Sequence, residues 1–148
     1  MDSIEKVLES WEKDSVVDIT EPSRELVKIP LLHSKYLNVL TRSKLASKKA
    51  QFDYLQLKKK KWEYYTGKLS QDELKEFGWE PFPFTLKSDI NLYLESDVDL
   101  IKLLQKKIIH DEIVSVVEAI MTELKSRDRK STRLNSSHIP LSRMPSSA

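Results

Sequence analysis

The sequence predicts an all-α protein: one long helix kinked by a proline and a second long helix near the C-terminus, packed as an elongated helical bundle. Two observations support this class. The 148 residues contain only two glycines, and the stretch 44–65 contains neither Gly nor Pro, so that a helix can run through it. A hydrophobic fraction of 39% beside 32% charged residues suits a bundle but is thin for a large solitary core. We therefore expect residues 1–127 to form one helical domain that is elongated or oligomeric.

The N-terminal region predicts two helices. Ser3 is placed to cap the first, which should end near Lys13. The residues on its apolar face are Ile4, Val7, Leu8 and Trp11. Thr20 is the expected cap of the second helix, and Pro22 falls in the first turn, where its missing N–H costs nothing. Pro30 should kink or interrupt this helix, and Gly67 should end it.

The region after residue 67 predicts a short helix, a loop and a brief extended segment. Ser70 and Glu73 form a capping box, which favours a helix over about 71–77. Residues 78–84 contain two prolines and three large rings, and we expect a loop that packs its aromatic side chains onto the bundle. Ile90, Leu92 and Leu94 alternate with polar residues, a pattern typical of a short strand.

The last predicted helix carries an unusually broad apolar surface. Ser96 and Asp99 read as its capping box, with Asp97 in the first turn, and the helix should run to about Arg127. A helix with apolar residues around most of its circumference is buried against more than one neighbouring helix. We expect some of those neighbours to belong to other subunits.

Residues 128–148 differ in character from the rest of the chain. Residues 128–138 match the in-frame translation of a widely used DNA-sequencing adapter, and residues 142–148 match its downstream end. We interpret 128–148 as a non-native, disordered tail that stands in place of a native C-terminal segment.

Several function classes are disfavoured by what the sequence lacks. There is no cysteine for a disulfide or a thiolate metal site, no apolar run of about 20 residues for a membrane span, and no visible signal peptide. Two glycines cannot build a phosphate-binding loop. His33 and His110 read as structural, and the acids are spread rather than clustered. We therefore predict no enzyme, cofactor or metal, and a cytoplasmic location.

The strongest functional signal is the basic stretch at residues 42–67. It places eight basic residues against one acid before Glu63, between flanks that are rich in acids. Residues 58–61 are four consecutive lysines, and helical spacing spreads them into a positive collar. Lysines beside aromatic rings suit a single-stranded nucleic acid, while a solvated helix face with core aromatics is the simpler interpretation. The candidate DNA-binding residues are Arg42, Lys44, Lys48, Lys49, Lys58, Lys59, Lys60, Lys61, Trp62, Tyr64 and Tyr65.

Short motifs around this stretch carry a family resemblance. The chain reads S-K-Y-L-N at 34–38, then a basic run, then E-Y-Y-T-G at 63–67, and K-S-R at 125–127. This pattern resembles the UvsY family of phage recombination mediators over most of residues 1–127, most strongly over 33–67. The family's DNA-contacting basic pair falls on Lys59 and Lys61, with Lys where the family often has Arg.

The resemblance implies a ring-like homo-oligomer that works in the cytoplasm of an infected bacterium. It implies binding to single-stranded DNA. It also implies help for a phage RecA-class recombinase (UvsX) in displacing the phage single-stranded-DNA-binding protein. The alternative from another class is a non-enzymatic structural oligomer or adaptor whose lysine-rich face is solvated.

Overall fold

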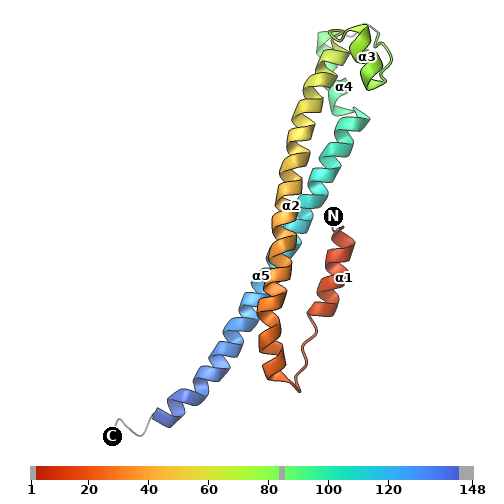
Figure 1. Cartoon of the computed structure of the whole chain (residues 1–148). Helices are drawn as coiled ribbons and strands as arrows, with labels where there is room; N and C mark the ends of the chain where they lie inside the picture. The colour runs from red at the N-terminus through yellow and green to blue at the C-terminus, as the bar shows by residue number, and fades with distance from the viewer. Residues whose placement is uncertain (1–2, 84–85, 144–148) are drawn as a thin grey trace. The chain divides into compact units, whose positions relative to one another are not determined.

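The computed structural model describes residues 3–83 and 86–143, with side chains of the last helix described up to Lys130. In these ranges the chain is helical without strands, which confirms the predicted all-α class (Figure 1). The elements are α1 (Ile4–Asp14), α2 (Pro22–Tyr65), α3 (Gln71–Phe77), the 3₁₀ helix η1 (Lys87–Asp89), α4 (Ile90–Glu95) and α5 (Val98–Arg143). The chain divides into two compact parts, a first part up to Lys44 and from Asp111 onward, and a second part Leu45–His110.

The core of the first part joins α1, the beginning of α2 and the later turns of α5. Its buried members are Val7, Leu32, Tyr36, Ile113, Val117, Ile120 and Leu124. Tyr36 is only 1% exposed, and its hydroxyl donates to Oδ2 of Asp14 at 2.8 Å. The same carboxylate accepts from Nζ of Lys35 at 2.6 Å. A buried hydroxyl thereby keeps a hydrogen-bond partner, which ties the end of α1 to α2.

The core of the second part is smaller and is built where α4 and the start of α5 pack on α2. Ile90, Leu94 and Leu100 are buried there, and partly buried Tyr54, Leu57 and Tyr65 of α2 pack against them. In Figure 1 the short elements α3 and α4 gather at the C-terminal end of α2. This arrangement decides which side chains of the basic stretch face solvent.

The beginning of α2 departs from the sequence-based expectation at two residues. Thr20 does not cap the helix, because its N–H and hydroxyl both donate to Oδ1 of Asp18 and stabilise a turn before it. Pro30 does not interrupt the helix, which continues through it to Tyr65. The Pro30 ring is exposed, while Leu32 and Tyr36 hold the following turns in the core. Packing thus offsets the hydrogen bond that proline cannot donate.

The predicted extended segment at residues 90–94 is wrong. These residues form α4, because Ile90 and Leu94 lie four apart and enter the core together, whereas Leu92 is 64% exposed. The cap of α5 also differs from the prediction. Asp97, not Ser96, accepts hydrogen bonds from the first N–H groups of α5, while the Ser96 hydroxyl donates back to the carbonyl of Leu92.

The remaining predicted boundaries concern the loop and the tail. The capping box of Ser70 and Glu73 and the helix 71–77 are confirmed. In the predicted loop, Phe84 lies outside the described residues. Helix α5 is assigned up to Arg143, while the interpretation of 128–148 as a non-native, disordered tail stays a prediction. Residues 128–139 contain neither Gly nor Pro, so nothing in them stops a helix. Residues 144–148 lie outside the described range, and the adapter origin of the tail stays a prediction.

Candidate nucleic-acid interface

One face of α2 in the second part carries lysines and apolar rings that are open to solvent. Lys48, Phe52, Leu55, Lys59 and Trp62 recur at alternating spacings of four and three, and we call this set the basic-aromatic stripe. At about 100° per residue they fall within roughly 80° of one another around the helix. Phe52 is 59% exposed, Leu55 52% and Trp62 40%. The stripe is therefore a continuous accessible surface, not a core face.

The positive charges of the basic stretch differ in how far they are neutralised. Among the described side chains, no ion pair involves Arg42, Lys48, Lys49 or Lys59. Two other lysines have acidic neighbours at 3.9 and 3.5 Å, in the pairs Lys44–Glu118 and Lys60–Glu63. Nζ of Lys58 lies 5.8 Å from the ring centre of Tyr54. The uncompensated lysines that the basic stretch contributes to the second part are on and beside the stripe.

Lys61 points into the second part and not into solvent. It is 5% exposed, and its Nζ lies 2.9 Å from Oδ2 of Asp99 and 3.2 Å from Oδ2 of Asp97. The same ammonium lies 4.2 Å from the ring centre of Trp79, within cation–π range. The four lysines at 58–61 therefore do not form an exposed collar all round the helix, because the fourth is an internal ion-pair partner.

Tyr64 and Tyr65 are likewise engaged within the chain. The Tyr64 hydroxyl donates to the carbonyl of Glu80 at 2.6 Å, and the Tyr65 hydroxyl donates to Oδ2 of Asp97. Their rings belong to a cluster with ring-centre distances of 4.9–5.6 Å. The other rings of the cluster are Trp79, Phe82 and Tyr93. Trp79 and Phe82, the loop aromatics within the described residues, thus pack onto the helices as predicted, and they cover the two tyrosines expected to stack on bases.

Asp97 holds this network together. Burial alone would raise the pKa of its carboxyl group, but hydrogen bonds from Tyr65, from the N–H of Leu100 and from Lys61 lower that pKa below its ordinary value. The pKa of the Tyr65 hydroxyl is raised by burial and by its hydrogen bond to Asp97. At neutral pH the cluster therefore contains an ionised Asp97 and a neutral Tyr65.

The end of α2 places Lys68 over Trp62. Gly67 adopts φ +73°, its N–H donates to the carbonyl of Tyr64, and the Lys68 N–H donates to that of Glu63. These two bonds form a Schellman motif, which requires the left-handed conformation that glycine adopts most easily. The chain turns back, and Nζ of Lys68 lies 4.1 Å from the ring centre of Trp62.

Sequence reasoning missed three residues of this surface, Phe52, Leu55 and Lys68. Phe52 lies within the basic stretch but is not among the predicted DNA-binding residues. Its position in the spacing 48-52-55-59-62 is the signal that could have identified it. Lys68 follows the helix stop, and no local pattern indicates that its side chain returns to Trp62.

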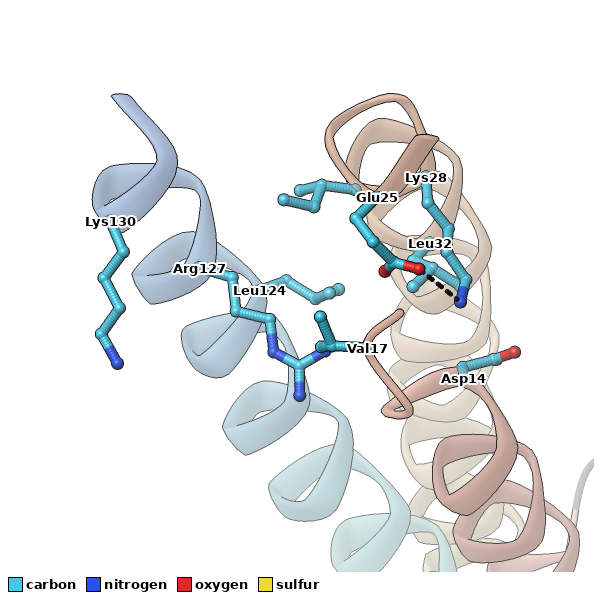
Figure 2. A pocket seen from close by; sticks show the side chains of 9 residues that line it. Asp14, Val17, Glu25, Lys28, Leu32, Leu124, Arg127 and Lys130 are labelled. Atoms are coloured by element: carbon cyan, nitrogen blue, oxygen red, sulfur yellow. Dashed lines mark ion pairs between the residues drawn. The ribbon is translucent and has the colours of Figure 1, made fainter. Parts of the chain in front are cut away.

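Two other grooves among the described residues are each lined by two or more basic side chains. One, of about 580 Å³ in the second part, is bordered by Lys59, Lys60 and Phe77 but also by Asp53. The other, of about 170 Å³ in the first part, has both signs of charge on its walls (Figure 2). Figure 2 shows Arg127 and Lys130 from α5 on one side, and Asp14 and the Lys28–Glu25 ion pair on the other. The first-part groove contains the acids Asp14 and Glu25, and the second-part groove contains Asp53. Because these carboxylates repel phosphate, both grooves are less suited to a polyanion than the stripe is.

The described ranges contain neither a metal-binding cluster nor a membrane-spanning helix. There, no group of three or more His, Cys, Asp or Glu side chains is arranged to hold a metal ion. None of the described helices is long and apolar enough to cross a bilayer.

The helices and the stripe together define an all-α protein with a surface suited to a single-stranded polyanion. A family model described as "Recombination, repair and ssDNA binding protein UvsY" matches residues 10–131. The chain belongs to the UvsY family, which confirms the predicted membership. The family is one of phage recombination mediators that bind single-stranded DNA.

Solved structures of the recombination mediator protein UvsY of bacteriophage T4 have the same fold. One crystal form is 19% identical with a TM-score of 0.76, and the match covers 96% of this chain and 99% of the T4 chain. A second form is also 19% identical, with a TM-score of 0.73 and coverages of 91% and 96%. No curated protein sequence gives a significant match.

Proposed function

We propose that this chain is a non-enzymatic recombination mediator that binds single-stranded DNA along the basic-aromatic stripe of α2. The observation that carries the proposal is the exposure of uncompensated Lys48, Lys49 and Lys59 beside the open rings of Phe52 and Trp62. Lysines without an acidic partner release counterions when they bind phosphates, and exposed rings stack on bases of any sequence. Binding through such a surface is strong for single strands and tolerant of sequence.

The proposal assigns different roles to residues that the sequence grouped together. Lys58, Lys59 and Lys60 remain candidate phosphate contacts with Lys48 and Lys49. Lys61, Tyr64 and Tyr65 act through the fold, since their polar atoms already have partners inside the second part. Arg42 and Lys44 belong to the first part and are proposed as additional phosphate contacts.

The mediator step follows from multivalency. We propose a ring-like homo-oligomer in which several stripes engage one strand, so that weak individual contacts give high avidity. Exposed apolar side chains on α5 support self-association, with Leu104 39%, Ile108 59% and Ile109 48% exposed. Bending the strand around such an assembly would loosen the phage single-stranded-DNA-binding protein and present DNA to the RecA-class recombinase UvsX. Nucleotide hydrolysis belongs to the recombinase in this scheme.

The decisive experiment compares two matched double variants in binding to single- and double-stranded oligonucleotides. Lys48→Ala with Lys59→Ala removes stripe lysines, while Lys102→Ala with Lys106→Ala removes two exposed lysines of α5 in the same part. We expect the first pair to weaken single-strand binding and the second to leave it close to the parent. If both pairs behave alike, the stripe is a solvated face and the structural or adaptor alternative replaces this proposal.

The mediator step needs its own assay. Recombinase ATP hydrolysis on single-stranded DNA that is already covered by the phage binding protein should start faster when this chain is added. The Lys48→Ala, Lys59→Ala variant should lose that acceleration. A chain that binds DNA but does not accelerate the recombinase would keep the DNA-binding assignment and overturn the mediator step.

A further inference from the structure

A groove of about 700 Å³ opens beside the exposed ring of Trp62, at the C-terminal end of the stripe. It lies entirely within the second part, between the last turn of α2, the turn after it, η1 and α4. Its volume is in the range of small-ligand sites, roughly 300–1,000 Å³. Ile90, 8% exposed, gives the groove an apolar floor that belongs to the core.

The walls of this groove carry the groups that a nucleotide needs. Trp62 offers a partly open indole ring, which stacks on any base. Lys68 and Lys87 lie on the walls as cations for phosphate, and the exposed amide of Asn91 can both donate and accept hydrogen bonds. Among the described residues that line the groove, none is acidic. The grooves lined by Asp14 and Glu25, by Asp53 and by Asp128 each contain a carboxylate, so charge complementarity favours this groove over those three.

The contact between Lys68 and Trp62 bears directly on how a nucleotide would sit. The ammonium lies 4.1 Å from the ring centre, held there by the turn at Gly67. The ammonium covers one face of the indole, so a base that stacks on the opposite face would have a cation near its own phosphate without any movement of the helix. The site is preorganised, which lowers the conformational cost of binding.

We infer that this groove is a nucleotide subsite for single-stranded DNA, in which one base stacks on Trp62 and the flanking phosphates pair with Lys68 and Lys87. The inference rests on the proposed single-strand binding and deepens it. The stripe lysines alone make affinity depend only on phosphates, whereas this subsite makes it depend on the presence of a base.

An abasic strand separates the contribution of phosphates to affinity from the contribution of bases. A dT oligonucleotide and an oligonucleotide of the same length built from abasic residues carry the same phosphates, and only the first offers bases. We expect the unaltered chain to bind the dT strand about tenfold more tightly, the effect of one base stacked on an aromatic ring. Trp62→Ala should lose most of this preference for the dT strand and keep the salt dependence of the parent.

Lysine variants test the phosphate half of the subsite. Lys68→Ala with Lys87→Ala should weaken binding to both strands and flatten the slope of log affinity against log salt by about 1.4, from roughly 0.7 per lost contact. The matched pair Lys102→Ala with Lys106→Ala should leave affinity and slope unchanged. An unchanged slope in the first pair overturns the phosphate assignment.

Fluorescence provides a readout that does not require removal of Trp62. Trp11→Phe with Trp79→Phe leaves Trp62 as the only tryptophan of the chain. Its emission should be quenched by the dT strand and much less by the abasic strand. Equal affinity for both strands, with equal quenching, overturns the subsite while leaving the proposed DNA binding intact. Failure to bind either strand overturns both.

Discussion

Nζ of Lys61 lies 2.9 Å from Oδ2 of Asp99, and this ion pair joins the last turns of α2 to the first turn of α5. The same Nζ lies 3.2 Å from Oδ2 of Asp97, whose side chain is 4% exposed. A lysine taken from the basic stretch thus stabilises the second part and orients the stripe on the opposite side of the same helix.

Lys61→Ala should destabilise the protein. It leaves the buried carboxylate of Asp97 without its cation, and breaking such a pair costs about 3–5 kcal/mol. Lys59→Ala, two residues earlier on the exposed stripe, should stay within about 0.5 kcal/mol of the parent. Urea unfolding followed by circular dichroism measures both. A Lys61→Ala protein as stable as the parent, but defective in DNA binding, would show that Lys61 contacts DNA directly.

The protein should lose stability in acid below about pH 4. In the folded chain the pKa values of Asp14 and Asp97 lie below their ordinary value. For each carboxyl group, burial raises the pKa, but hydrogen bonds lower it by more than burial raises it. Asp14 accepts these bonds from Lys35 and Tyr36. Asp97 accepts them from Tyr65, the N–H of Leu100 and Lys61. The unfolded chain then binds more protons in acid, so stabilisation present above the unfolded pKa of about 3.9 is lost as pH falls through the folded values.

Urea unfolding at pH 6, 5, 4 and 3 checks this dependence. Asp97→Asn should be less stable than the parent at pH 6 and should change less between pH 5 and pH 3, because one carboxylate with a lowered pKa is gone. A parent protein whose stability does not change across this range would contradict the assignment of ionised, hydrogen-bonded carboxylates.

Gly67→Ala should cost about 1–2 kcal/mol through backbone strain alone. Gly67 has φ +73°, and a Cβ added there would meet no atom within 4 Å, so packing is not disturbed. Gly67→Asn should cost less, because asparagine tolerates the left-handed conformation better than alanine does. Thermal melting of the two variants gives the comparison. Equal melting temperatures for Gly67→Ala and the parent would mean that the turn over Trp62 is not maintained in solution.

The salt dependence of DNA binding should report how many stripe lysines contact phosphates. If Lys48 and Lys59 each neutralise one phosphate, Lys48→Ala with Lys59→Ala should flatten the slope of log affinity against log salt by about 1.4. The loss should be the same for oligonucleotides of different sequence, because phosphate contacts carry no base information. Titrations on dT and dC strands at several salt concentrations measure it. A loss that depends on sequence would place these lysines on bases.

Self-association should depend on exposed residues of α5 and not on its core. Ile113 and Val117 are both 0% exposed, so Ile113→Asp with Val117→Asp should unfold the first part. Ile108→Asp with Ile109→Asp changes side chains that are already half open and should leave helix content intact while reducing the sedimentation coefficient. If this second pair sediments like the parent, α5 does not carry the subunit contact at these residues.

The sequence by itself determined the helical class and most helix ends of this protein, because those depend on local chemistry. The capping box at Ser70 and the stop at Gly67 act within one turn, so they are readable without a fold. The basic stretch was readable for the same reason, as was the family, whose motifs lie within short segments.

Tertiary structure alone decided which members of that stretch face solvent. The sequence does not distinguish the four consecutive lysines at 58–61. Lys61 nevertheless forms ion pairs with Asp97 and Asp99, which lie 36 and 38 residues further along the chain. Packing likewise turned residues 90–94 into a helix, because Ile90 and Leu94 enter the core of the second part together. Burial and ion pairing depend on residues that are distant in sequence. Helical periodicity predicts which residues share a face of a helix, but not which other element packs against that face.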